Sequence, residues 1–292
     1  MSTASRATPE PGTSSPGSAH DRGVDISGHV LARIGVELDQ LGDGWRFRLP
    51  VRPVLLDGDG HVSFGVLGVF LDLAASQAPA MAERGHFVHA DITLHRLRAP
   101  RGRDLVVSAE ATRMGKRTGI LELELHDDEG VHVARSVQEV VFLDSVQMPA
   151  AVGLAARAAF FAQLVGECTL DRPLLEVVQV TRDDGPDGSP RWVIPLIDSN
   201  RNGYGGLHGG VATALVDAAA AGALADVAGR PARTTSAALR YLAPSTVGPI
   251  AAHPQVLHLD DATGTAVVAV RVRDAEGRTT IVADAHVAVA PA

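Results

Sequence analysis

A glycine-rich stretch in the second half of the chain carries the residues best suited to chemistry. Asn202 is followed six residues later by His208, Gly209 and Gly210, and the apolar run after them contains Asp217. A glycine loop that opens into a helix presents unpaired backbone N–H groups and the positive end of the helix dipole. Such a helix start suits an anion, or an oxygen atom that becomes negative during a reaction. The stretch therefore predicts an oxyanion-binding helix start.

Two acidic residues, Asp72 and Asp217, each lie within an otherwise apolar stretch with helical spacing. Burial raises the pKa of a carboxyl group, which suits a general base. Asp217 follows His208 by nine residues, a rise of roughly 13 Å along a helix. It therefore cannot reach a group held at the start of its own helix, and the acid for that helix start is expected from another helix.

The elements that must position these residues occur twice along the chain. Each half contains a run of strand-like segments interrupted by one long apolar helical pattern. In the first half, the expected strands are 34–41, 45–49, 89–97, 104–112, 119–126 and 131–143, with a helix at about 63–83. In the second half, they are 174–181, 191–197, 234–242, 250–259, 265–272 and 279–289, with a helix at 208–228. A stretch at 155–165 with helical spacing is expected to join the halves.

Four landmarks recur in the same order in both halves, which indicates an internal repeat of about 147 residues. They are Trp45 with Trp192, Asp72 with Asp217, Arg96-Leu-Arg-Ala-Pro100 with Arg240-Tyr-Leu-Ala-Pro244, and the acidic turn ending at Gly130 with that ending at Gly277. We expect each half to wrap a curved antiparallel sheet around its helix, and the two units to pair. The fold class is therefore α+β.

Composition narrows the class of protein. The chain has 292 residues, 46% of them hydrophobic, with a formal net charge of −8. This charge argues against a nucleic-acid partner, because neutralising phosphates needs a basic face. Cys168 is the single cysteine, which excludes a disulfide within the chain and disfavours a zinc–cysteine site. A cytoplasmic location fits this composition.

The N-terminal segment reads as a disordered leader, because residues 1–22 are rich in Ser, Thr, Pro and Gly and lack the apolar core of a secretory signal. No apolar run reaches the roughly 20 uncharged residues of a membrane span. The segment 211–228 comes nearest, but Asp217 and Asp226 interrupt it. We therefore expect no membrane partner.

The spacing of Asn202, His208-Gly209-Gly210 and Asp217, followed by Tyr241-Leu-Ala-Pro244, resembles the PaaI-like group of hotdog-fold acyl-CoA thioesterases. The resemblance covers about 191–289, and the segment 34–143 resembles the same fold with a degraded motif. It implies a tandem, double-hotdog arrangement. The boundaries that follow are a leader at 1–23, an N-terminal hotdog at 24–144, a linker helix at 145–172 and a C-terminal hotdog at 173–292.

The resemblance implies hydrolysis of an acyl-CoA thioester to a free acid and coenzyme A, without a metal or another cofactor. The backbone N–H of Gly209 would polarise the thioester carbonyl, an Asp would act as general base or nucleophile, and Asn202 would orient the reacting groups. His208 would cap the helix. The expected substrate-binding residues are Gly210, Tyr204 and one of the hydroxyl residues Thr234, Thr235 and Ser236.

Because hotdog units supply the acid across their interface, the resemblance and the repeat together predict that Asp72 completes the Gly209 site and that Asp217 faces the first-half loop. The same spacing counted back from Asp72 aligns Asp57 with Asn202, Ser63 with His208, Phe64 with Gly209 and Gly65 with Gly210. The bulk of Phe64 and the negative charge of Asp57 disfavour an oxyanion. We expect one competent and one degenerate site per chain.

Two other features leave alternatives open. His86, His89 and His95 come close together, and alternation along a strand would put His89 and His95 on one face, but scattered histidines are usually structural, so no metal is expected. An arginine-rich segment at 96–117 is either a solvated face or a contact for coenzyme A phosphates.

Alternatives to a thioesterase are a non-catalytic acyl-CoA-binding or regulatory module and a hotdog enoyl-CoA hydratase. A fold shared by several chemistries does not by itself fix the reaction. The sequence leaves the acyl group and the formation of a homo-oligomer open, because each chain already contains the usual pair of hotdog units.

Overall fold

The computed structural model describes residues 28–41, 44–81, 87–143 and 163–290. The expected leader at 1–23 lies outside these residues, as does most of the expected linking helix. In the first half, the helices are α1 (Val30–Arg33), η2 (Pro53–Leu55), α2 (Phe64–Ala74), η3 (Ala75–Gln77) and η4 (Pro79–Met81). The strands are β1 (Glu37–Leu41), β2 (Gly44–Pro50), β3 (Phe87–Arg96), β4 (Asp104–Met114), β5 (Thr118–Asp127) and β6 (His132–Phe142).

The second half repeats this order. Its helices are α4 (Leu174–Val177), η5 (Asp198–Asn200) and α5 (Gly209–Ala228). Its strands are β7 (Thr181–Asp184), β8 (Pro190–Ile194), β9 (Ala232–Tyr241), β10 (Ile250–Asp260), β11 (Thr265–Arg273) and β12 (Thr279–Val289). Each half is thus a run of antiparallel strands with one principal helix, as the sequence predicts.

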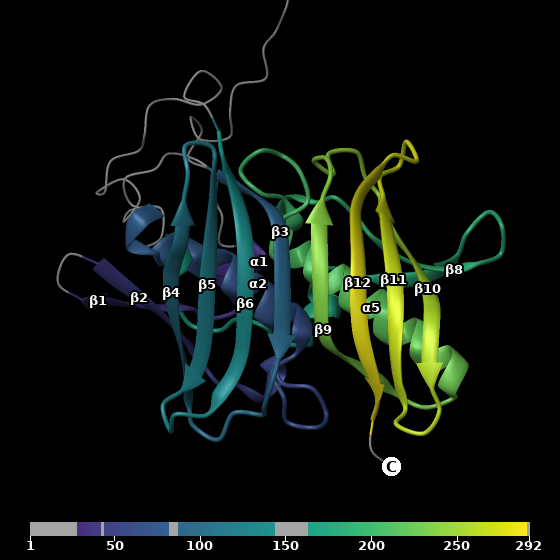
Figure 1. Ribbon diagram of the computed structural model, residues 1–292, viewed down its shortest axis with the longest axis horizontal. Coiled ribbons are helices and arrows are strands. Elements are labelled where there is room, and N and C mark those ends of the chain that lie inside the picture. The colour runs from purple at the N-terminus through teal and green to yellow at the C-terminus, as the bar shows by residue number, and fades with distance from the viewer. Residues whose placement is uncertain (1–27, 42–43, 82–86, 144–162, 291–292) are drawn as a thin grey trace, which may run out of the picture.

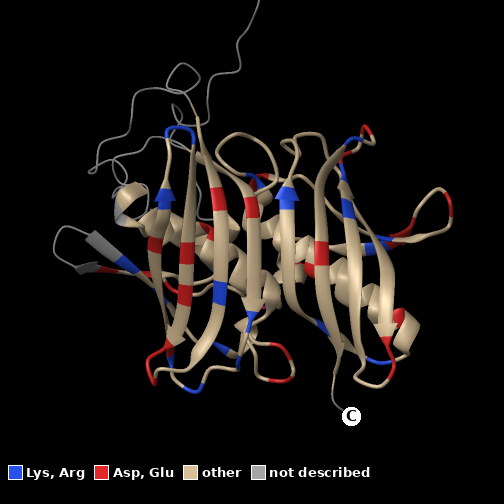
Figure 2. Cartoon of the chain, in the orientation of Figure 1, with Lys and Arg blue, Asp and Glu red and all other residues tan. Residues whose placement is uncertain are grey.

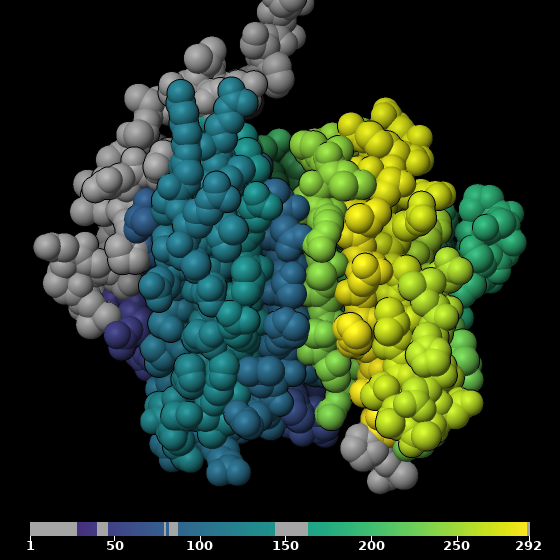
Figure 3. Space-filling model, viewed as in Figure 1, coloured from purple at the N-terminus to yellow at the C-terminus, as the bar shows by residue number. Residues whose placement is uncertain are grey.

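All twelve strands form one sheet, in the order β1-β2-β4-β5-β6-β3-β9-β12-β11-β10-β8-β7 (Figure 1). The halves meet where β3 pairs antiparallel with β9, and Thr93 lies opposite Ala238 at the centre of that pairing. From outside, the two halves form one continuous face (Figure 3). Because β3 and β9 run in opposite directions, the last residues of β3 and the last residues of β9 lie at opposite ends of this strand pair.

Helices α2 and α5 lie together behind the sheet (Figure 1). Small residues let them approach closely: a Cβ atom built on Gly65 would stand 2.7 Å from the Ala214 Cβ, and one on Gly68 would stand 2.6 Å from the Thr213 Cβ. On the facing helix, a Cβ at Gly210 would stand 2.4 Å from the Val69 Cα. This contact decides which side chains of one helix reach the start of the other.

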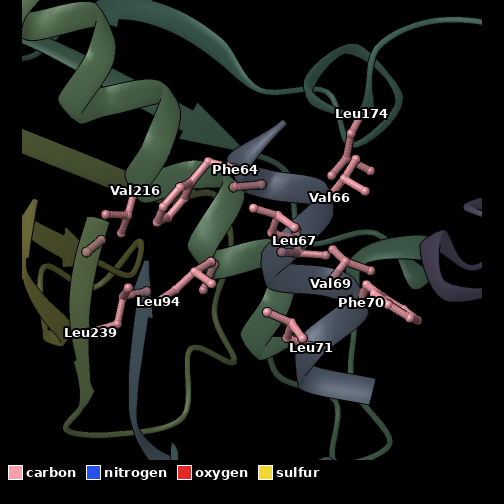
Figure 4. Close-up of a cluster of buried hydrophobic side chains, with 14 of the residues drawn as sticks. Phe64, Val66, Leu67, Val69, Phe70, Leu71, Leu94, Leu174, Val216 and Leu239 are labelled. Atoms are coloured by element: carbon pink, nitrogen blue, oxygen red, sulfur yellow. The ribbon is translucent and has the colours of Figure 1, made fainter. Parts of the chain in front are cut away.

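Apolar side chains from both halves fill the space between the helices and the sheet. Figure 4 shows Phe64 of α2 beside Val216 of α5, with Leu94 of β3 and Leu239 of β9 beneath them. Charged residues lie mainly on strands and loops, and the two helices carry few of them (Figure 2). Helix α5 has the length and apolar character of a membrane span, but 61% of its most apolar 18-residue stretch is buried in this core.

Two expected elements differ from those observed. Helix α2 ends at Ala74 and continues as the short turns η3 and η4, because Ser76 donates its hydroxyl hydrogen to the Leu73 carbonyl and Pro79 cannot continue a helical hydrogen-bond ladder. The segment 174–181, expected as a strand, begins instead with the one-turn helix α4, because the carbonyl of its N-cap residue Pro173 accepts the Val177 N–H.

The internal repeat is confirmed, with one correction of register. The inward-facing residues Ile92, Leu94 and Arg96 of β3 occupy the places of Ala237, Leu239 and Tyr241 in β9. Arg96 therefore corresponds to Tyr241 and not to Arg240, as the matched motifs suggest. Of the two tryptophans, Trp192 packs against Gly222 of α5, and the side chain of Trp45 lies outside the described part of the structure.

Candidate active site

Helix α5 begins at Gly209, and His208 is its N-cap residue. The His208 Nδ1 atom accepts a hydrogen bond from the Gly210 N–H at 3.2 Å. Within the described part of the chain, the Gly209 N–H meets no acceptor, as expected for the first donor of a helix. The helix start therefore presents one unused donor, and His208 caps the helix as predicted.

The carboxylate of Asp72 lies at this helix start. A Cβ atom built on Gly209 would stand 2.4 Å from the Asp72 Oδ2 atom, so the contact requires a glycine. Asp72 comes from α2 of the other half, and its side chain is 12% exposed. The close packing of the two helices thus brings an acid from the first half to the loop of the second, which is the pairing that the resemblance and the repeat together predict.

The two oxygen atoms of Asp72 have different surroundings. Oδ1 lies 3.6 Å from Nδ1 of His89 on β3. Oδ2 lies 3.8 Å from Nδ1 of His208, but that nitrogen already accepts the Gly210 N–H and so carries no proton to donate. Oδ2 is buried and has no hydrogen-bond partner among the described residues. A buried acceptor without a partner is unusual, and this one is available to a ligand.

Tyr241 and Thr213 secure the first turn of α5. The Tyr241 hydroxyl donates to the Gly209 carbonyl at 2.9 Å, and the Thr213 hydroxyl donates to the same oxygen at 3.3 Å. Burial, with a further contribution from the charge of Asp72, holds the pKa of Tyr241 well above its ordinary value. Tyr241 therefore remains a hydrogen-bond donor at physiological pH, and the glycine peptide is held in one orientation.

The loop before the helix is organised by its own side chains. The Asn202 Oδ1 atom accepts the N–H groups of Tyr204 at 2.9 Å and Gly206 at 3.1 Å. The Asn202 amide is thus used within the loop, and its expected role in orienting reacting groups stays a prediction. Tyr204 lies at the tip of the loop and is 38% exposed, and burial of its hydroxyl raises the pKa of Tyr204 to about 12.

His29, which precedes both repeated halves of the motif, connects the segment 28–33 to this loop by a hydrogen bond. The His29 Nε2 atom lies 2.7 Å from the Arg201 carbonyl, and the His29 ring packs edge-on against the His208 ring at 5.6 Å. Burial, and then the neighbouring His208, lower the pKa of His29 to about 4. His29 is therefore neutral at physiological pH and donates through Nε2 to hold the loop against residues 28–33.

The reciprocal arrangement holds at the start of α2. Asp217 of α5 lies beside the Gly65 N–H and the Thr234 hydroxyl, and burial raises the pKa of Asp217 to about 6. The Thr234 hydroxyl is enclosed and makes no hydrogen bond of good geometry among the described residues. Asp217 thus faces the first-half loop and not the start of its own helix.

The first-half loop differs from its counterpart in two ways. Asp57, which occupies the place of Asn202, forms an ion pair with the buried Arg96. Its negative charge is therefore compensated, and Phe64 is the stronger departure. The Phe64 side chain is 1% exposed and packs against α5 (Figure 4). Ser63 caps α2 by accepting the Val66 N–H, as His208 caps α5.

The structure places the expected hydroxyl residues away from the Gly209 helix start. Thr234 points inward beside Asp217, two helical turns along α5. The Thr235 hydroxyl donates to the His286 carbonyl, and Ser236 lies on the opposite face of β9 from the buried Ala237. The reason is the direction of β9: its first residues, which include Thr234, lie beside Asp217, and only its last residue, Tyr241, reaches the start of α5.

Four residues of this site are not among the site residues that the sequence predicts. His89 and Tyr241 lie near Asp72, Thr213 bonds to the Gly209 carbonyl, and His29 holds the loop. Simple alternation places His89 on the same face as His95, but a β-bulge between His89 and Asp91 turns His89 inward. The signal for Tyr241 was present in the repeat, but the one-residue shift in register concealed it. Among the described residues, no group of three His, Cys, Asp or Glu side chains is arranged to hold a metal ion.

The arginine-rich segment spans both ends of β4, with Arg98, Arg101 and Arg103 before the strand and Arg113, Lys116 and Arg117 at its far end. Arg98 and Arg101, with His61 and His132, line a groove of about 620 Å³ next to the end of β3. Strand β3 ends at Arg96, which forms an ion pair with Asp57 of the first-half loop. This groove therefore adjoins the first-half loop. Both interpretations of the segment, a solvated face and a phosphate contact, stay open.

Comparisons with known proteins bear on the fold and on the chemistry. Residues 204–281 match the model of the thioesterase superfamily, and residues 9–142 match the model of the acyl-CoA thioesterase C-terminal domain. Among curated proteins, none matches the sequence significantly. The two family models support thioester hydrolysis in general as the chemistry of the chain.

Solved structures share the architecture. The tesB protein of Mycobacterium avium subspecies paratuberculosis is 13% identical, with a TM-score of 0.61 over 90% of this chain and 98% of that one. Acyl-CoA thioesterase II TesB2 of Mycobacterium marinum is 13% identical, with a TM-score of 0.59 over 91% and 98%. The 12:0-ACP thioesterase of Umbellularia californica is 11% identical, with a TM-score of 0.58 over 85% and 95%. The fold is a double hotdog.

Proposed function

We propose that the protein hydrolyses an acyl-CoA thioester at the site formed by Asp72 and the start of α5. The single observation that supports this most strongly is the approach of the Asp72 carboxylate to Gly209. A buried base without a hydrogen-bond partner on Oδ2 and an unused N–H donor stand side by side, and thioester hydrolysis needs this pair. The spacing of Asn202, His208 and Asp217 supports the PaaI-like group as the narrower affiliation.

The proposed reaction begins with the substrate carbonyl oxygen accepting the Gly209 N–H. Water attacks the carbonyl carbon and gives a proton to Oδ2 of Asp72, and the resulting oxyanion is stabilised by the N–H group and the positive end of α5. The carbon–sulfur bond then breaks, and the proton passes to the departing thiolate. The products are a carboxylic acid and coenzyme A. Direct attack by Asp72, which forms an anhydride that water cleaves, is the other route with the same balance.

This reaction needs no metal or cofactor, because Asp72 supplies the base and the helix start supplies the electrophilic contact. In the same proposal, the protein acts in the cytoplasm on its acyl-CoA substrate, with Tyr204 and Gly210 near the bound thioester. The first-half site contributes little hydrolysis, because Phe64 fills the position of Gly209.

Release of free thiol from a panel of short, long and aryl acyl-CoA esters tests the proposal. We expect turnover of at least one member by the wild-type chain and its loss in Asp72→Asn. Binding of the esters without thiol release would favour a non-catalytic acyl-CoA-binding module. Addition of water to an enoyl-CoA without cleavage of the thioester would favour a hydratase.

A further inference from the structure

His89 approaches the same carboxylate that stands at the helix start, but from a different element. Its side chain is 8% exposed, and its Nδ1 atom lies 3.6 Å from Asp72 Oδ1. The helix start meets the other oxygen, Oδ2. We propose that His89 is a positioning residue for the reaction at Asp72: its Nδ1–H holds Oδ1, so that Oδ2 stays free and directed at the Gly209 N–H. This inference rests on the proposed function.

Among the described residues, the other side chains that could donate a hydrogen bond to the Asp72 carboxylate are already engaged, and His89 is not. His208 cannot donate through Nδ1, since that atom accepts the Gly210 N–H. Tyr241 gives its hydroxyl hydrogen to the Gly209 carbonyl, and His29 lies against Arg201. Of these neighbours, His89 is therefore the one placed to donate to Asp72. Closing 3.6 Å to a hydrogen bond of about 3 Å takes a small rotation of the ring, as expected when a ligand tightens a site.

The second ring nitrogen of His89 also indicates that this place binds a ligand. The Nε2 atom is buried and has no hydrogen-bond partner among the described residues. Asp72 Oδ2 has the same status. Buried polar atoms in folded proteins are nearly always paired, and two exceptions on adjoining side chains indicate a space that a bound molecule or water completes.

The other half of the chain supplies an internal comparison. At the pseudo-equivalent place, inward-facing and next to a bulge in β9, the residue is Thr234, which lies beside Asp217. There the facing helix begins with Phe64. Histidine thus accompanies the acid that faces an open helix start, and threonine accompanies the acid that faces a blocked one. This difference fits a role of His89 in the reaction and not in the fold alone.

The test uses two variants of the full-length chain. His89→Ala removes the donor, and His89→Asn keeps an N–H group near the place of Nδ1. We expect His89→Ala to lower kcat by about 10- to 100-fold with little change in KM, since misplacing a catalytic group by about 1 Å costs on that order. His89→Asn should recover most of the loss. Wild-type kcat in His89→Ala, or no recovery in His89→Asn, overturns the proposal.

A measurement independent of activity separates this proposal from the proposed function. Nitrogen-15 NMR of labelled protein reports which ring nitrogen of His89 carries the proton. We expect the Nδ1–H form in the wild type and its loss in Asp72→Asn, while Ser236→Ala, on the outer face of β9, leaves it unchanged. If no acyl-CoA is hydrolysed but this tautomer depends on Asp72, the pair stands and the assigned reaction fails. A tautomer indifferent to Asp72 overturns the pairing whatever the activity.

Discussion

The carboxylate of Asp72 lies so close to the backbone of Gly209 that a methyl group on that glycine would stand 2.4 Å from Oδ2. The two residues come from different halves of the chain, and α2 and α5 meet through glycine contacts that leave no room for larger residues. The relationship brings an acid next to the unused N–H donor of a helix start, and it predicts the effects of several substitutions.

Substitution of the two neighbouring glycines separates chemistry from folding. In Gly209→Ala the new methyl group meets the end of the Asp72 side chain, which can rotate away, so we expect kcat to fall by about 100-fold with a folded chain. In Gly210→Ala the methyl group meets the Val69 backbone at 2.4 Å, which cannot yield easily, so unfolding should occur at a lower urea concentration. Thiol release and urea titration measure the two effects. Full activity in Gly209→Ala would contradict the site.

The internal repeat provides a matched pair of acid substitutions. Asp72→Asn should reduce kcat by about 10²- to 10⁴-fold, because the base that takes the proton from water is lost. Asp217→Asn should retain most of the activity, because that carboxyl group faces the helix that begins with Phe64. Steady-state kinetics on one acyl-CoA decides the assignment. The reverse order of effects would move the active site to the first-half loop.

The raised pKa of Asp217 predicts a dependence of stability on pH. Burial favours the protonated form in the folded chain, where the pKa is about 6, above the ordinary value of 3.8. The folded state therefore binds more protons than the unfolded state between these values, and the free energy of unfolding falls as pH rises from about 4 to about 6. The loss is up to about 3 kcal/mol.

Urea unfolding at pH 4 and pH 7 measures this effect. In Asp217→Asn the step should shrink, and the variant should be more stable than the wild type at pH 7. Because Asp57 and Arg96 also face this carboxyl group, Arg96→Gln should steepen the step. Identical pH profiles for the wild type and Asp217→Asn would show that another group titrates in this range.

Asn202 distinguishes a loop role from a direct role toward the substrate. Its Oδ1 atom accepts two backbone N–H groups, so Asn202→Asp keeps both hydrogen bonds and should retain activity within several-fold. Asn202→Ala loses both, at about 1 kcal/mol each, and we expect a loss of about tenfold in kcat/KM. If Asn202→Asp is as impaired as Asn202→Ala, the amide N–H group is the part that matters, either through the Leu207 carbonyl at 3.5 Å or through the substrate.

The tandem architecture could be predicted from the sequence because its signals are local. The apolar spacing of 64–74 and 209–228, the N-cap at His208 and the paired acidic turns each depend on residues close together in the chain. Helix geometry alone excluded Asp217 from its own helix start. The resemblance to hotdog enzymes and the repeat together indicated Asp72, and the two halves meet with that residue at Gly209.

The surroundings of the site depended on contacts between distant segments. A bulge in β3 turned His89 inward. A bulge at the equivalent place in β9 keeps the two strands in step, so that Arg96 corresponds to Tyr241, which packs against the core, and not to the exposed Arg240. An ion pair with Arg96 compensates the negative charge of Asp57, which from the sequence alone was expected to disfavour an oxyanion. Periodicity and capping are properties of neighbouring residues and can be read along the chain. Bulges, ion pairs and the approach of two helices are set by packing across the sheet, and only the tertiary structure decides them.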